Sequence, residues 1–213
     1  IGMAGADIGV PQLLTVAHIL VPNHRPFAVR APYQLLQEIF AVLQMTEFAE
    51  PFVILRFALL GDLLYHGPRN DLPDGYAPRE VARMLNGLAG RIVAVRGNCD
   101  AEVDQMVLEF PCMADYAELV DDGGRTLFLT HGHVFGAGFH NSVDNIPALA
   151  EGSAVVYGHT HVKVNEAVGA RPGIWAFNPG SVSIPKDGSH SYGIYESGEA
   201  LESAFRHVVL EEA

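Results

Sequence analysis

Basic side chains are scarce in this chain of 213 residues. Lysine and arginine number 13 against 25 aspartates and glutamates, so the formal net charge is −12 at pH 7. A protein that binds a nucleic-acid backbone needs the opposite balance, because its affinity comes from neutralising phosphates. The composition therefore argues against a nucleic-acid duplex or an anionic membrane as partner. A small phosphorylated substrate held by metal ions is compatible with it, since bound cations set the local charge.

Cysteine is also rare, and no apolar run is long enough to span a membrane. Cys99 and Cys112 form no CxxC pair, which excludes a disulfide framework and favours a reduced, cytoplasmic protein. A spanning helix needs about 20 apolar residues, whereas prolines and a histidine interrupt the apolar stretch 10–22. If exposed, that stretch is a candidate contact between the subunits of a homo-oligomer.

An apolar run followed by a glycine-containing polar loop occurs five times. Runs of this length, rich in valine and isoleucine, predict strands buried on both faces. They cover residues 52–60, 92–95, 127–129, 155–157 and 174–177.

A helical pattern lies between the first two of these runs. Pro78 suits a first helical turn and Gly90 suits the end, with apolar residues between them at helical spacing. A second helical pattern covers about 32–45. Strand, helix and strand in this order predict a right-handed crossover in a layered α/β domain. A mostly β layer is expected from about 125 to 195, and the whole chain, 1–213, is interpreted as one domain.

Side chains that can bind metal ions stand in four of the polar loops. In layered α/β sheets, ligands collect beyond the carboxyl ends of the strands, where these loops begin. The four loops are Gly61-Asp62, Gly97-Asn98-Cys99-Asp100, His131-Gly132-His133 and Gly158-His159-Thr160-His161.

The chemistry of these loops suits a pair of divalent cations. One carboxylate can bridge two ions about 3.5–4 Å apart, and an amide oxygen binds an ion without adding charge. Residues two apart in a strand face the same side, so each His-x-His pair can converge on one region. Each loop alone has an ordinary alternative, namely a turn, a helix cap or a core histidine. Together they predict a metal centre of the manganese, iron, zinc or cobalt type.

The loop after Asp62 offers groups that bind phosphate. Arg69 carries a planar fork of donors that matches phosphate oxygens, and His66 can donate to the same group. We expect both to contact the substrate. The alternative for this segment is a rigid surface turn with a solvated arginine.

The four loops, followed by Asn178-Pro179-Gly180-Ser181, resemble the motifs of the calcineurin-like metallophosphoesterases over about residues 53–195. Two segments are similar, more narrowly, to a bacterial phosphodiesterase of that family: Gly61 to Asn70 and Ala94 to Asp104. The resemblance implies a four-layer α/β/β/α sandwich of the metallophosphoesterase type, with two divalent metal ions between its sheets. Manganese is the first choice of metal, with zinc, iron, cobalt or magnesium as alternatives.

The resemblance also implies a role for each loop. Asp62 bridges both ions, and His161 binds the second of them. Cys99 and Asp100 belong to the catalytic loop. Many relatives carry a histidine where Cys99 stands, and a thiol is a weaker hydrogen-bond donor, so diesters with good leaving groups are favoured. The remaining ligands of the first ion are Asn98, His131 and His159.

Residues 1–51 are atypical for the family. The resemblance calls for an Asp-x-His pair on a first strand, whereas this chain has Ala6-Asp7-Ile8-Gly9. Asp7 is the nearest match for a further metal ligand, with His18 and His24 as substitutes. Three alternatives are open: a site completed by other residues, a weakened site, or an altered N-terminal sequence.

The predicted function is hydrolysis of a small phosphodiester, less favourably a monoester, by a metal-activated water at a two-metal centre. One alternative is a metal-poor scaffold of the same fold that binds other proteins. Another is a structural zinc site built from the histidines, which predicts loss of folding on chelation.

Overall fold

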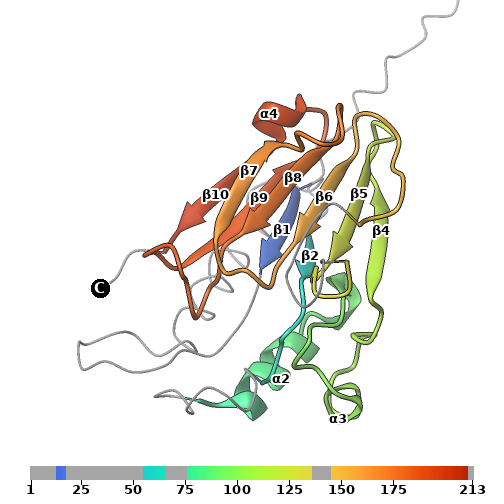
Figure 1. Cartoon of the computed structure of the whole chain (residues 1–213). Coiled ribbons are helices and arrows are strands. Elements are labelled where there is room, and N and C mark those ends of the chain that lie inside the picture. Colours follow the sequence, from blue (N-terminus) through green and yellow to red (C-terminus); the bar gives the residue numbers. More distant parts are fainter. Residues whose placement is uncertain (1–12, 18–54, 66–75, 136–144, 211–213) are drawn as a thin grey trace, which may run out of the picture.

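Two five-stranded sheets form the centre of the computed structural model, which describes residues 13–17, 55–65, 76–135 and 145–210 (Figure 1). The first sheet has the order β10-β9-β1-β2-β3, in which β1, β2 and β3 are parallel and β9 and β10 antiparallel to their neighbours. Its strands are β1 (Leu13–Ala17), β2 (Leu55–Leu59), β3 (Ile92–Ala94), β9 (Ser191–Glu196) and β10 (Phe205–Val209).

The second sheet has the order β4-β5-β6-β8-β7. Its inner strands β5, β6 and β8 are parallel, and β4 and β7 pair antiparallel at the two edges. The strands are β4 (Tyr116–Val120), β5 (Thr126–Thr130), β6 (Ala154–Tyr157), β7 (Lys163–Ala167) and β8 (Trp175–Pro179).

The main core lies between the two sheets. Its members are buried apolar side chains that the two sheets contribute jointly, and each of the larger ones, such as leucine or phenylalanine, contributes about 1.5–3 kcal/mol of hydrophobic stabilisation. Residues from the first sheet and its loops are Ala58, Leu60, Val95, Tyr195 and Phe205; those from the second sheet are Leu127, Leu129, Ala154, Val156 and Phe177.

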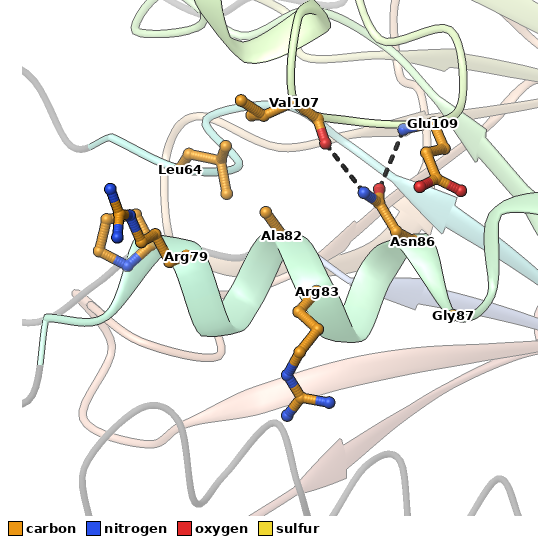
Figure 2. Close-up of a pocket in the computed structure, with 9 residues that line it drawn as sticks. Leu64, Arg79, Ala82, Arg83, Asn86, Gly87, Val107 and Glu109 are labelled. Atoms are coloured by element: carbon orange, nitrogen blue, oxygen red, sulfur yellow. Dashed lines mark hydrogen bonds between the residues drawn. The ribbon is translucent and has the colours of Figure 1, made fainter.

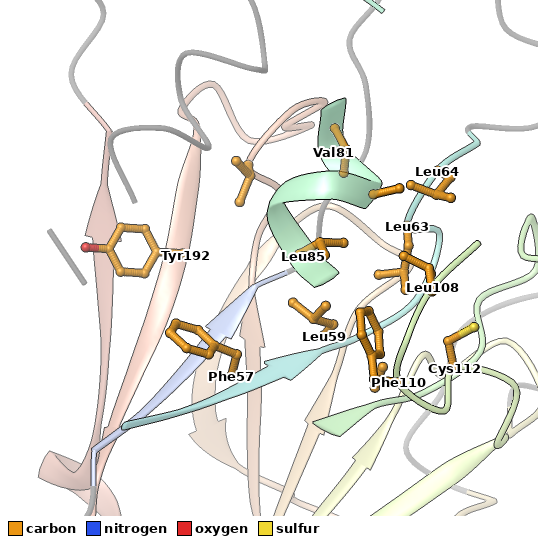
Figure 3. Packing of buried hydrophobic residues seen from close by; sticks show 13 residues of the cluster. Phe57, Leu59, Leu63, Leu64, Val81, Leu85, Leu108, Phe110, Cys112 and Tyr192 are labelled. Atoms are coloured by element: carbon orange, nitrogen blue, oxygen red, sulfur yellow. The ribbon is translucent and has the colours of Figure 1, made fainter. Parts of the chain in front are cut away.

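Helix α2 (Pro78–Asn86) covers the outer face of the first sheet (Figure 3). Proline suits its first turn because the ring presets φ and the missing N–H has no intrahelical partner there. Val81 and Leu85 are four residues apart and therefore face the same side, where they pack with Phe57 and Leu59 of β2. The remaining helical elements are short: η2 (Ala89–Arg91, a 3-10 turn), α3 (Glu102–Gln105) and α4 (Leu201–Ala204).

The outer face of the second sheet carries a separate apolar cluster. Phe128, Val155 and Ala176 project from its strands and pack with Ile146 and other residues from the connecting segments. A helix layer, two facing sheets and this outer cluster confirm the predicted α/β sandwich. Among the described residues, no helix has the length and apolar character needed to cross a membrane.

The five predicted strands and the predicted helix at Pro78 are all present, the helix ending at Asn86 rather than near Gly90. The second predicted helix, 32–45, lies outside the described residues. Part of the apolar stretch 10–22 forms β1, an inner strand paired with β2 and β9. A subunit contact through that stretch stays a prediction. Five described strands, β1, β4, β7, β9 and β10, had no prediction of their own, although β7 and β9 fall in the β layer expected from about 125 to 195.

Candidate metal centre

The base of the site is a contact between the two sheets. Asp62 follows β2 of the first sheet, and His131 follows β5 of the second. The Asp62 Oδ2 atom lies 3.4 Å from Nε2 of His131, and only 3% and 0% of the two residues are exposed. The ends of parallel strands thus bring a carboxylate and an imidazole together in the interior, as predicted.

Two further predicted ligands complete a tight group around His131. Its Nε2 atom lies 3.0 Å from Oδ1 of Asn98 and 3.0 Å from Nδ1 of His159. One ligand atom each from Asp62, His131 and His159 lies within 4.8 Å of the others. Asn98 is exposed and His159 half-buried, so the group is closed at the Asp62 side and open to solvent at the other.

The distribution of protons in this group fits a metal ion. His131 Nδ1 lies 2.5 Å from the Leu60 carbonyl, which fixes the imidazole proton on Nδ1 and leaves Nε2 as a lone pair. That lone pair faces a carboxylate oxygen, an amide oxygen and an imidazole nitrogen. A proton on His159 can satisfy one of these three contacts at most. A divalent cation satisfies all of them, because each atom is a ligand of the type that manganese, iron, zinc or cobalt accepts.

Asp62 and His131 do not form an ion pair, although their atoms are close enough for one. Burial raises the pKa of Asp62 to about 7, against the hydrogen bond from the Cys99 backbone. Burial also holds the pKa of His131 well below its ordinary value. His131 is therefore neutral near neutral pH, and the Asp62 carboxyl is about half protonated there. A bound cation reverses this for the carboxylate by supplying the missing positive charge.

Manganese affinity should consequently rise with pH up to neutrality. Metal must displace the proton of Asp62, whose pKa is about 7, whereas His161, with a pKa of about 4, is neutral throughout. Below pH 7 we expect about a tenfold loss of affinity per pH unit, by proton–metal competition. Calorimetric titration of the metal-free protein with Mn²⁺ from pH 5.5 to 8 measures this. An affinity that stays constant between pH 5.5 and 7 would contradict it.

Asp100 joins the two loops that carry Asp62 and Asn98. Its carboxylate accepts three backbone hydrogen bonds, each 2.7 Å long, from the N–H groups of Asp62, Leu63 and Gly97. Burial raises its pKa, and these hydrogen bonds oppose the rise. Asp100 thus holds the loops in register. Its direct participation in catalysis stays a prediction.

Glycine allows the two loops to touch. A Cβ atom on Gly97 would overlap the carboxylate and backbone nitrogen of Asp62, and one on Gly61 would overlap the backbone of Gly97. The Cys99 N–H then reaches Oδ1 of Asp62 at 2.8 Å. The Cys99 sulfur accepts a hydrogen bond of 3.2 Å from the Asn98 amide. The predicted catalytic thiol therefore lies beside two predicted ligands.

The histidine loops have a different conformation from the one predicted. Neither pair lies in a regular strand, because β5 ends at Thr130 and β6 at Tyr157. His159 and His161 instead adopt positive φ angles of 66° and 61°. His161 lies outside the group formed by Asp62, His131 and His159, and its place at a second ion stays a prediction.

His133 belongs to a predicted His-x-His motif but is not one of the predicted ligands, and it lies beside two of them. Its ring centroid lies 5.2 Å from that of His131 and 6.3 Å from that of His159. Burial lowers its pKa, and its Nδ1 atom is buried without a hydrogen-bond partner. The His-x-His spacing was the available signal for this residue.

Three predicted site residues, Asp7, His66 and Arg69, lie outside the described residues. A cavity of about 670 Å³ lies elsewhere, between α2 and the segment around Val107 (Figure 2). Its lining includes Arg79 and Asn86 but none of the predicted metal ligands. The metal centre is thus separate from this cavity.

Comparison with known proteins connects this geometry to one family. The family model of the calcineurin-like phosphoesterase superfamily domain matches residues 44–199. The chain belongs to the calcineurin-like phosphoesterase superfamily. This membership confirms the prediction of a metallophosphoesterase, an enzyme of the hydrolase class, and a family that uses divalent metal ions accounts for the convergent ligand atoms.

Individual relatives agree with this assignment. The chain is 53% identical over 140 residues to phosphodiesterase YfcE of Escherichia coli strain K12, covering 65% of this chain and 71% of that protein. The solved structure of YfcE, described as a phosphoesterase from E. coli, matches with a TM-score of 0.68 and 39% identity, over 94% of this chain and 98% of that one.

A more distant metallophosphoesterase shows the same fold. The metallophosphoesterase from Sphaerobacter thermophilus matches with a TM-score of 0.55 and 20% identity, over 94% of this chain and 89% of that one. At this identity the likeness concerns the fold alone.

Proposed function

We propose that the chain is a metal-dependent phosphodiesterase that hydrolyses a small phosphodiester at a two-metal centre. The observation that carries this proposal is the meeting of Asp62, Asn98, His131 and His159 at the ends of strands from both sheets. The similarity to YfcE, which is named a phosphodiesterase, supports a diester as substrate.

The described residues have distinct parts in this proposal. Asp62 and His131 form the buried base that holds the first ion, and the exposed Asn98 and half-buried His159 complete its ligands at the open side. The substrate enters from that open side. When bound, divalent ions polarise the phosphoryl oxygens and lower the pKa of a water molecule. In the hydrolysis, a water oxygen would bond to phosphorus, the ester P–O bond would break, and the alcohol would leave with a proton that comes from that water.

His161 would hold the second ion together with Asp62. The Ile184 carbonyl lies 2.7 Å from Nδ1 of His161, so this imidazole carries its proton there and offers Nε2 to a metal. Asp7 is the proposed further ligand. His66 and Arg69 are proposed to hold the phosphate, and Cys99, a poor proton donor, favours diesters with good leaving groups.

Hydrolysis of bis-p-nitrophenyl phosphate in the presence of Mn²⁺ tests the proposal. His159→Ala and Asn98→Ala each remove one ligand of the first ion. We expect each to lower the rate by more than about tenfold, because metal ligation contributes several kcal/mol to the transition state. Glu118→Gln, an exposed change on β4, serves as the control and should leave the rate unchanged. Activity that survives both ligand substitutions would overturn the assignment of the site.

The metal content of the purified protein separates this proposal from the scaffold alternative. An enzyme with the proposed centre should take up two equivalents of Mn²⁺ per chain and turn over diester. A metal-poor scaffold should take up none and show no turnover with any divalent ion. A structural zinc site would show itself by unfolding when a chelator is added.

A further inference from the structure

The segment Asn178-Pro179-Gly180-Ser181 contributes nothing to the metal-binding group, yet it contacts the loop that carries two of the histidines. Strand β8 runs parallel to β6 with Phe177 opposite Val156, so Asn178 comes to lie beside the loop that follows β6. Its side chain is fully buried. A buried carboxamide must find hydrogen-bond partners, and the nearest polar groups belong to that loop.

Three hydrogen bonds fix the Asn178 side chain. Its Nδ2 atom donates to the Gly158 carbonyl at 2.9 Å and to Oγ1 of Thr160 at 3.0 Å. Its Oδ1 atom accepts from the backbone N–H of Gly180 at 3.0 Å. Asn178 therefore bonds to the residue before His159 and to the residue after it.

The loop that Asn178 holds has an unfavourable backbone conformation. His159 and His161 both have positive φ angles, which side chains other than glycine rarely adopt and which persist only where the surroundings enforce them. The Gly158 N–H donates to the His131 carbonyl at 3.2 Å, and the Lys186 N–H donates to the His161 carbonyl at 3.0 Å. These contacts fix the two ends of the loop, and Asn178 fixes its centre.

We propose that Asn178 is a positioning residue for the metal centre, acting through Gly158 and Thr160 to hold His159 and His161 in ligand geometry. This inference rests on the proposed function in taking the two histidines as metal ligands. Partners of this kind, one step removed from the metal, typically change metal affinity by about 10–100-fold when they are replaced.

Asn178→Asp is the sharpest test, because it keeps the size and the acceptor for Gly180 but removes the donor to Gly158 and Thr160. We expect Mn²⁺ affinity, measured by titration of the metal-free protein, to fall by about 10–100-fold. Thr160→Val, which removes the hydroxyl acceptor, should lower the affinity in the same direction. Thr160→Ser, which retains the hydroxyl, should have the Mn²⁺ affinity of the wild type.

Gln105→Glu is the matched control. The Gln105 amide also bonds to loop groups, donating to the Leu108 and Phe110 carbonyls and accepting from the Cys112 N–H and thiol, and all of these partners lie outside the histidine loop. Its substitution should lower the melting temperature and leave Mn²⁺ affinity unchanged.

Two results would overturn the inference. One is an equal effect of Asn178→Asp and Gln105→Glu on Mn²⁺ affinity at matched losses of melting temperature, which would make Asn178 a purely structural residue. The other is a wild-type protein that binds no Mn²⁺, which would overturn the proposed function as well. A wild-type protein that binds Mn²⁺ without hydrolysing diesters would contradict the proposed function alone, and the affinities of the variants would still decide the role of Asn178.

Discussion

Asp62→Asn should abolish manganese binding and lower diester hydrolysis by about 10³-fold or more. The carboxylate is the one charged ligand among the four that meet at the site, and it is the group proposed to bridge both ions. An amide of the same size retains one acceptor oxygen but neither the charge nor the second oxygen. Loss of several kcal/mol of metal-based transition-state stabilisation corresponds to this factor. Mn²⁺ titration and the rate with bis-p-nitrophenyl phosphate measure the two effects.

The same substitution should not destabilise the metal-free protein at pH 8. Burial raises the pKa of Asp62 from 3.8 to about 7, so between these values the folded state binds more protons than the unfolded state. Stability therefore falls as the pH rises through this window, by up to about 4 kcal/mol above pH 7. Asparagine has no such penalty. In the presence of a chelator, the variant should melt at or above the temperature of the wild type.

Asp104→Asn provides the control for this experiment. Asp104 is another buried aspartate, and its carboxylate accepts one hydrogen bond of 2.8 Å from the Ala101 N–H, which asparagine can also accept. Mn²⁺ binding and turnover should be unchanged. If Asp62→Asn bound Mn²⁺ as tightly as the wild type, the position of Asp62 at the centre of the site would be wrong.

The sequence was sufficient for the strands formed by short apolar runs, although the edge strand β3 is only partly buried. The runs that became β2, β3, β5, β6 and β8 are short, apolar and followed by glycine or polar residues. Few structures other than a buried strand need this pattern. Strand β4 went unpredicted because its residues alternate between exposed and half-buried, a pattern that the search for continuous apolar runs does not detect. The pairing of β1 with β2 and β9 depends on contacts more than 40 residues apart in the chain, which local periodicity does not contain.

For the site, the sequence indicated which residues converge but not what holds them. Asp62, Asn98, His131 and His159 were selected from their residue types and their places after apolar runs. The three backbone N–H groups that donate hydrogen bonds to Asp100 belong to loops more than 30 residues apart. The sequence therefore contains no signal that Asp100 joins these loops. The predicted strand alternation of His159 and His161 was wrong because both occupy a loop at positive φ, a conformation that histidine propensity does not favour.

The close approach of the loops around Asp62 and Gly97 leads to the second large effect. Gly97→Ala should disable the site although the residue binds no ligand. The added Cβ would overlap both the carboxylate and the backbone nitrogen of Asp62, and backbone atoms cannot rotate away as a flexible side chain can. The loops must separate, which breaks the hydrogen bonds of Asp100 and displaces the central ligand. Displacement of a catalytic group by about 1 Å can cost on the order of 10²-fold in rate, and overpacking of this kind costs about 1–3 kcal/mol or more of stability.

Gly90→Ala separates the effect of the overlap from that of replacing a glycine. Gly90 has no atom within 4 Å of a built Cβ, so alanine there should be neutral or stabilising by up to about 1 kcal/mol, through reduced entropy of the unfolded chain. Thermal unfolding should therefore give a lower melting temperature for Gly97→Ala than for Gly90→Ala, and Mn²⁺ titration should give a lower affinity. If Gly97→Ala and Gly90→Ala had the same melting temperature and Mn²⁺ affinity, the close contact between the Gly97 loop and Asp62 would be wrong. The hydrogen bonds of Asp100 would then have no part in placing the Asp62 carboxylate.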